Sequence, residues 1–166
     1  MLSSYLLFAL PLLASAAPSL NARFGNEVVY ISRCIADSGS NNQLEADYYS
    51  DIGNSQNLQT PNSVSQPQFV NSGQPNFNGQ HSYFFPDSGV TFTYNAQNIN
   101  QPAGTQVGTG SNGSPFTCFR DTDRNLYYRH GQNNRPCVAV LYCRKSRRCS
   151  KLQLTVMALG RKAGRA

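Results

Sequence analysis

The stretch from residue 114 to residue 143 constrains the fold of this chain most. It contains three short apolar and aromatic runs, FTCFR, LYYRH and CVAVLYC, which are separated by the polar segments DTDRN and GQNNRP. Runs of this length that are bounded by Asp, Asn, Gly and Pro are typical of strands joined by tight connections. The stretch therefore predicts a three-stranded antiparallel meander.

The cysteines predict that cross-links hold this fold. In an oxidising compartment an even subset of the five is expected to pair, and Cys149 is left out because it lies in a segment of different composition. The remaining four allow three connectivities, among which the sequence cannot choose. We favour Cys34–Cys143 with Cys118–Cys137, which would join the first strand to the last and tie neighbouring strands of the meander. No C-x-x-C spacing occurs, so we expect no metal site.

The first residues read as a secretion signal. Residues 6–13 form an apolar run, and Ala14-Ser15-Ala16 supplies the small residues at which a signal peptide is cut. The run is shorter than the roughly 20 residues that span a bilayer. We therefore expect a signal peptide over residues 1–16, a secreted, extracellular protein and no transmembrane segment.

The net charge of +6 is unevenly distributed. Residues 24–143 contain five basic and eight acidic residues, whereas residues 144–166 contain eight basic residues and no acidic one. We expect a single β-rich domain over 24–143, with no nucleic-acid partner for this core domain. We expect the basic tail over 144–166 to be disordered or to come from a reading frame that runs past the natural end.

Two further segments predict strands. Residues 26–36, NEVVYISRCIA, place apolar side chains on both faces, which indicates a central strand. Residues 81–94, HSYFFPDSGVTFTY, read as a hairpin that turns at Pro86–Gly89. The fold class that follows is mainly β: a small, disulfide-stabilised antiparallel β-sandwich or barrel with long polar loops.

Residues 37–79 are rich in Asn, Gln, Ser and Gly. Glu45, Asp47 and Asp51 would make this segment the most negative patch of the surface. It could serve as a variable binding surface or as a solvated cover, and we favour the cover, because polar loops usually only connect. The aromatic residues expected to hold it in place are Tyr48, Tyr49, Phe69 and Phe77.

The loop that follows the hairpin carries the only glycosylation sequon of the chain, Asn112-Gly113-Ser114. Pro115 comes directly after it, which makes it a weak acceptor.

No catalytic motif stands out, so we assign no catalytic residue. In an alternative interpretation, His81 and His130 act as acid and base of a ribonuclease while Arg129 or Arg120 steadies the phosphate. Fungal guanyl-specific ribonucleases also place a His close to a Tyr, as His81 and Tyr83 are placed, but their glutamate base has no counterpart in this chain.

Two other patterns suggest sites less specifically. Asp121, Asp123 and Asn125 match the start of an EF-hand loop, but Leu126 stands where that loop needs glycine, so a turn is the better interpretation. The run from Tyr127 to His130 has a composition suited to stacking on sugars or bases.

The motifs YISRC, DYYSDIGNSQN and FPDSGVTFT, together with the closing cysteine pattern, give the chain a family likeness. It resembles the small cysteine-rich secreted proteins of filamentous fungi that are called candidate effectors. This resemblance implies a compact, disulfide-bonded β fold that binds host or competitor molecules, and it carries over no active-site residue.

We therefore expect a secreted, non-enzymatic protein that interacts with a host, a competitor or a cell wall. Its partner would be a host or cell-wall component that the sequence does not identify, and no cofactor is expected. The first alternative is a secreted ribonuclease-like toxin that uses His81, His130 and Arg129. The second is a cationic antimicrobial protein that acts through its tail.

Overall fold

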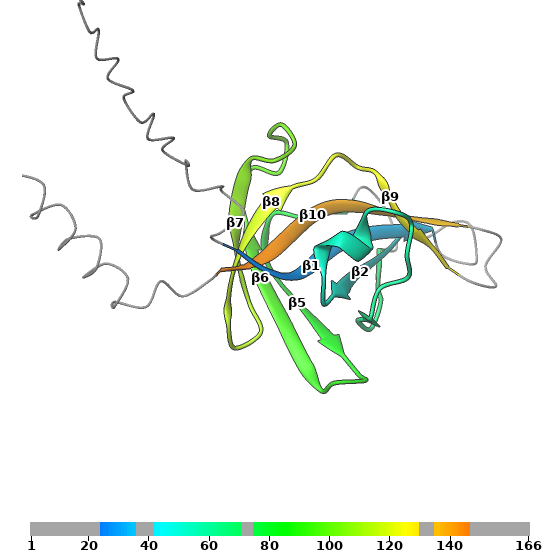
Figure 1. Ribbon diagram of the computed structural model, residues 1–166. Helices are drawn as coiled ribbons and strands as arrows, with labels where there is room; N and C mark the ends of the chain where they lie inside the picture. The colour runs from blue at the N-terminus through cyan, green and yellow to red at the C-terminus, as the bar shows by residue number, and fades with distance from the viewer. Residues whose placement is uncertain (1–23, 36–41, 71–74, 130–134, 147–166) are drawn as a thin grey trace, which may run out of the picture.

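The computed structural model describes residues 24–35, 42–70, 75–129 and 135–146, which form ten strands and one short 3-10 helix, η2 (Ile52–Ser55) (Figure 1). The strands are β1 (Phe24–Ile35), β2 (Asn42–Tyr49), β3 (Ser63–Val64), β4 (Gln68–Val70), β5 (Gly79–Phe85), β6 (Val90–Ala96), β7 (Gln106–Ser111), β8 (Pro115–Arg120), β9 (Asn125–Tyr128) and β10 (Pro136–Ser146). The expected signal peptide, His130, Cys149 and the tail from residue 147 onward lie outside the described residues.

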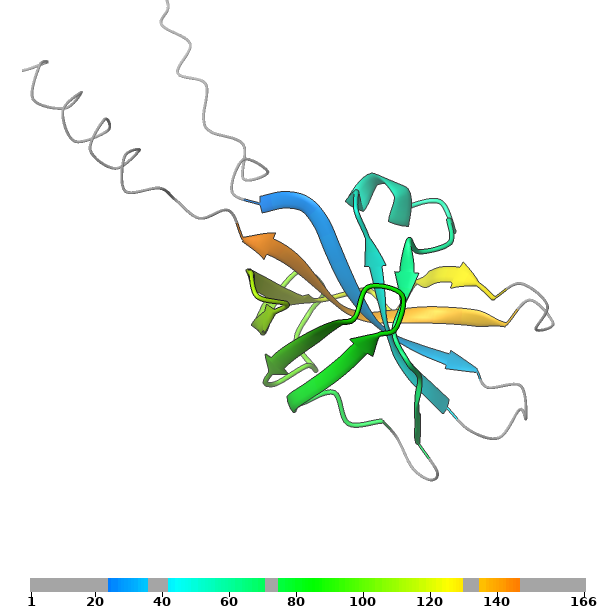
Figure 2. The ribbon, with the colours of Figure 1, turned by 90° about the horizontal axis from the view of Figure 1, so that it is seen from below.

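All the strands belong to one antiparallel sheet with the order β3-β2-β1-β10-β8-β7-β6-β5; β4 also pairs with β2, and β9 with β10. The two ends of this sheet approach each other. The backbone N–H of Gln66 donates to the carbonyl of Phe84 at 2.8 Å, and Gln68 Nε2 donates to the carbonyl of Ser82 at 2.8 Å. The sheet therefore forms a nearly closed barrel, which confirms the expected fold class (Figure 2).

The first strand is central, as its two apolar faces predicted. β1 lies between β2 and β10 in the sheet. Val29 and Ile31 point into the barrel, while Val28 and Tyr30 point to the outside of the sheet, and all four are buried.

Two cores result from this arrangement. The barrel interior is filled mainly by the aromatic residues Phe77, Tyr83, Phe85, Phe92, Tyr94 and Phe116. The outer core lies on the other face of the sheet and includes Tyr49, Leu126 and Tyr127, with Ile52 of η2 packed against it. Each core contains one disulfide: Cys118–Cys143 in the barrel and Cys34–Cys137 in the outer core.

The predicted strands of residues 114–143 are present, but the predicted meander is wrong. Both β8 and β9 pair with β10, along one edge of it: β8 with residues 141–145 and β9 with residues 136–138. Because β10 is eleven residues long, the six-residue β8 and the four-residue β9 fit along it end to end. The short link between them continues the direction of the chain and does not reverse it.

The four expected cysteines form the two disulfides, but the favoured pairing is wrong. The bonds are Cys34–Cys137 and Cys118–Cys143. Antiparallel pairing places the end of β1 beside the start of β10, so Cys34 faces Cys137. Likewise, Cys118 of β8 faces Cys143. The two cysteines of β10 are six positions apart, about 20 Å along a strand, so Cys118 cannot reach Cys137.

The hairpin expected over residues 81–94 is present as β5 and β6, and Gly89 takes the positive φ of 67° that its turn needs. The last strand ends at Ser146, three residues beyond the expected domain end at Cys143. The added residues are held by pairing, since Arg144 lies opposite Val28 of β1 and Thr117 of β8.

In the predicted polar segment over 37–79, the described residues, 42–70 and 75–79, are more ordered than a solvated cover. They supply β2, η2, β3 and β4, and Tyr49 and Phe77 are buried as expected. Phe69, in contrast, is 59% exposed. The prediction that this segment forms a negative surface patch is also wrong, because Glu45 and Asp47 are fully buried. Alternation along β2 turns both carboxyl groups toward the outer core, where β9 covers them.

Replacing Gly108 with alanine is expected to lower the free energy of unfolding by about 1–3 kcal/mol, the usual cost of overpacking. A Cβ at this position would lie 2.1 Å from the carbonyl oxygen of Asn95, at a point where the β7–β8 register is irregular. Urea unfolding measures the loss. The control is Thr109→Ala at the exposed neighbouring position, and equal midpoints for the two variants would contradict the close approach.

Candidate ligand-binding site

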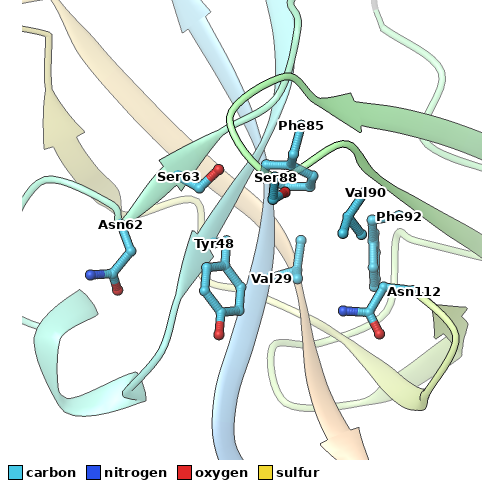
Figure 3. Close-up of a pocket in the computed structure, with 9 residues that line it drawn as sticks. All are labelled: Val29, Tyr48, Asn62, Ser63, Phe85, Ser88, Val90, Phe92 and Asn112. Carbon is cyan, nitrogen blue, oxygen red and sulfur yellow. The ribbon is translucent and has the colours of Figure 1, made fainter.

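A pocket of about 300 Å³ opens where the β5–β6 hairpin approaches β1 and β2 (Figure 3). Aromatic and aliphatic side chains line it together with amides and hydroxyls. The nine residues that line it are Val29, Tyr48, Asn62, Ser63, Phe85, Ser88, Val90, Phe92 and Asn112. None of these nine carries a charge.

The hairpin tip forms one wall of the pocket. The backbone N–H of Gly89 donates to the carbonyl of Phe85 at 2.9 Å and closes the turn. The hydroxyl of Ser63 donates to Asp87 at 2.7 Å, which ties the tip to β3. Phe85 is nearly buried at the base of this wall, whereas Val90 is 36% exposed and available to a ligand.

Tyr48 and Asn62 form the opposite side of the pocket. The carbonyl of Tyr48 accepts a hydrogen bond of 2.8 Å from the backbone N–H of Asn62. The side-chain oxygen of Asn62 accepts from the backbone N–H of Ser50, also at 2.8 Å, so the amide is held in place. Burial and, to a smaller extent, the nearby carboxylate of Glu27 raise the pKa of Tyr48. Its phenol therefore stays protonated and can donate a hydrogen bond.

Asn112 closes the pocket from the turn between β7 and β8. Its side-chain oxygen accepts a hydrogen bond of 3.3 Å from the backbone N–H of Ser114. Figure 3 shows the side chain of Asn112 beside Phe92, with its amide at the pocket opening. An apolar floor with amide and hydroxyl groups at the edge suits a neutral ligand that has one apolar face and several hydroxyls.

A second and more polar pocket of about 230 Å³ lies beside η2. Arg124 lines it, but its guanidinium is engaged: Nη1 donates to the carbonyl of Ser55 at 2.8 Å, and Nε lies 3.5 Å from Asp121 Oδ1. The same group lies over the ring of Tyr30, 5.2 Å from its centre. Because this cation helps to cover the outer core, we regard the pocket at the hairpin as the better ligand site.

A buried carboxylate organises the outer core. Glu45 is fully buried and forms an ion pair with Arg129. It also accepts hydrogen bonds from Tyr127 Oη at 2.5 Å and from Gln43 Nε2 at 3.2 Å. These partners satisfy the charge and connect β2 to β9. Neither pocket is lined by any member of this cluster, so we assign it a structural role.

Asp47 lies two residues further along the same face of β2 and is also fully buried. The hydroxyl of Ser32 donates to its Oδ2, while Oδ1 has no hydrogen-bond partner. Burial raises the pKa of Asp47 to about 7, although the hydrogen bond from Ser32 and the nearby hydroxyl of Tyr127 oppose this shift. Asp47 is therefore largely protonated in mildly acidic solution.

The residues of the alternative ribonuclease interpretation are not brought together where the structure describes them. The ring of His81 shares the inner face of β5 with Tyr83 and stacks on Tyr94, 5.1 Å between ring centres. Arg129 lies on the outer side of β2 with Glu45. His130 is outside the described residues, and Arg120 donates to the carbonyls of Asp121 and Val140.

The EF-hand-like run folds as a connection between β8 and β9. Asp123 has a φ of 57° and pairs with Arg120, and Asp121 Oδ1 accepts from the backbone N–H of Thr122 at 2.6 Å. Both carboxylates are therefore used within the connection, in agreement with the predicted turn.

Sequence reasoning did not find the pocket. Three of its polar residues, Asn62, Ser63 and Asn112, come from segments that read only as polar loops. The hairpin motif was visible, but nothing in its sequence indicates which part of the chain would face it. The sequon at Asn112 was the one signal within the sequence.

No protein-family model, curated protein or solved structure matches the chain. In the described part of the chain, no helix has the length and apolar composition needed to cross a membrane. The function is therefore inferred from the pocket and the fold.

Proposed function

We propose that this chain is a secreted, non-enzymatic binding protein that interacts with a host, a competitor or a cell wall by holding a neutral carbohydrate in the pocket at its hairpin. The single observation that supports this most is the uncharged lining of the pocket, in which aromatic and amide side chains lie side by side. A sugar ring has an apolar face for the aromatic groups and hydroxyls for the amides.

The surroundings of the pocket favour recognition over catalysis. Among the described residues, none that lines the pocket has a carboxyl, imidazole or thiol group, which are the usual acids, bases and nucleophiles. The two disulfides suit an oxidising compartment and give the barrel a rigid frame. A rigid, preformed site loses little conformational entropy when a ligand binds.

The proposal predicts that Val90→Lys weakens binding of neutral oligosaccharides at least about tenfold, because it places a cation in an uncharged pocket. Val90 is partly exposed at the hairpin tip, so the fold should tolerate the change. Titration calorimetry with fragments of β-glucan, chitin, mannan and xylan measures the affinity. The matched control is Phe69→Ala, an exposed aromatic residue that does not line the pocket.

Two results would contradict the proposal. One is that the wild-type protein, produced in a host that does not glycosylate it, binds none of these oligosaccharides, or that Val90→Lys binds them as well as the wild type does. The other is specific turnover of an oligosaccharide, of RNA or of a peptide by the purified protein, which would make it an enzyme.

A further inference from the structure

One residue belongs both to the glycosylation sequon and to the lining of the pocket. Asn112 belongs to the Asn112-Gly113-Ser114 motif and also lines the pocket at the hairpin. The turn that carries it is accessible: Gly113 is exposed, has a φ of 94°, and has no atom within 4 Å of the position that a Cβ would occupy. Asn112 itself is half-buried, and an acceptor asparagine in a turn that reaches solvent is the arrangement expected of a modified sequon in a secreted protein.

The side chain of Asn112 is oriented by its turn. Its oxygen accepts from the backbone N–H of Ser114, and its backbone N–H donates to the carbonyl of Ser114 at 3.4 Å. The amide nitrogen is the end that remains for attachment. In Figure 3 this nitrogen points across the pocket opening, toward Val29 and Tyr48. A group attached there would begin at the edge of the pocket.

We propose that Asn112 is an N-glycosylation site and that the first sugar of its glycan lies across the pocket, so that the glycosylated protein cannot bind a free carbohydrate. The transfer uses an oligosaccharide linked to a polyprenyl diphosphate. The amide nitrogen forms a bond to the anomeric carbon of N-acetylglucosamine and loses one proton, while the bond from that carbon to the diphosphate breaks and the diphosphate carrier leaves.

The attached sugar has the chemistry that the pocket suits. N-acetylglucosamine is neutral, has an apolar ring face and presents hydroxyl and amide groups. A short covalent link gives it an effective concentration of about millimolar or more at the pocket, so it outcompetes a weakly bound free sugar. Since Pro115 lowers transfer to this sequon, we expect two forms of the protein, one open and one blocked.

The modification itself is tested by mass. The full chain is secreted from a eukaryotic host as the wild type and as the variants Ser114→Ala and Ser114→Thr, which destroy and keep the sequon while leaving Asn112 in place. Intact mass spectrometry should show a glycan on a fraction of the wild type, on a fraction of Ser114→Thr at least as large, and on none of Ser114→Ala. Unmodified masses for all three proteins would overturn the proposal.

The blocking of the pocket rests on the proposed function and is tested separately. Lectin chromatography separates the two wild-type forms, and calorimetry compares their affinity for an oligosaccharide that Ser114→Ala binds. The glycosylated form should bind at least tenfold more weakly, and equal affinities would overturn the blocking.

Hydrogen exchange distinguishes a failure of the proposed carbohydrate binding from a failure of the glycan to lie across the pocket. If Ser114→Ala binds no oligosaccharide, the proposed function fails, but the position of the glycan can still be measured. Amides of residues 85–92 should exchange more slowly in the glycosylated form than in the open form, whereas those of residues 125–128, on the outer core, should not differ. Equal exchange over 85–92 in the two forms would show that the glycan does not lie across the pocket.

Discussion

The double variant Cys34→Ala/Cys137→Ala is expected to lower the free energy of unfolding by about 5 kcal/mol. The disulfide joins residues that are 103 positions apart, so its removal frees almost the whole domain in the unfolded state. The bond also packs against the buried carboxylate, since Glu45 Oε1 lies 2.9 Å from Cys34 Sγ and 3.3 Å from Cys137 Sγ. Loss of the two sulfur atoms leaves a cavity beside that charge, which adds to the cost.

The matched control is Cys118→Ala/Cys143→Ala. This disulfide closes a loop of only 25 positions, for which the same chain-entropy relation gives about 3.5 kcal/mol. Both pairs are compared by urea unfolding in a Cys149→Ser background, so that no free thiol exchanges with the remaining bond. A larger loss for the Cys118 pair than for the Cys34 pair would contradict the assigned connectivity and packing.

Asp47 is expected to make the protein less stable as the pH rises from about 4 to about 7. Its pKa is raised from 3.8 to about 7 in the folded protein, so the folded state binds a proton that the unfolded state has released over this range. The contribution of protonated Asp47 to the free energy of unfolding is fully present below about pH 4. It is lost as the pH rises from about 4 to about 7, and it does not change further above that range. Its size is roughly 4 kcal/mol.

The variant Asp47→Asn isolates this effect. An amide keeps the acceptor for Ser32 and carries no charge, so its stability should not respond to this titration. Urea unfolding of both proteins from pH 4 to pH 8 should show the wild type falling relative to the variant. The difference removes the contributions that both proteins share, such as that of the Glu45–Arg129 ion pair. Parallel curves would contradict a protonated Asp47.

The local elements were predictable because their signals are local. The two apolar faces of residues 26–36 identified a central strand, and the turn PDSG identified a hairpin. The same reasoning assigned Glu45 and Asp47 to the surface, because acids surrounded by Asn and Ser usually lie in water. Their burial depends on β9 and the residue that follows it, about 80 residues away, which supply Tyr127 and Arg129 as partners.

The candidate site was less predictable than the fold. Its residues come from β1, β2, β3, the β5–β6 hairpin, the loop before β3 and the turn after β7, and none of them is an unusual residue for its own segment. Only the approach of the sheet's two ends places the hairpin against the β2–β3 region. Such long-range packing leaves no pattern within a stretch of ten residues.

The sequence by itself determined the β class, the position of the central strand and which four cysteines pair, because alternation, turn residues and composition act on neighbouring positions. Only the tertiary structure decided that β8 and β9 lie end to end along β10, and with this which cysteines face each other. It likewise decided that an uncharged pocket forms beside Asn112. These features depend on which strands pair and in which register, and register is set by the packing of whole faces in the closed barrel.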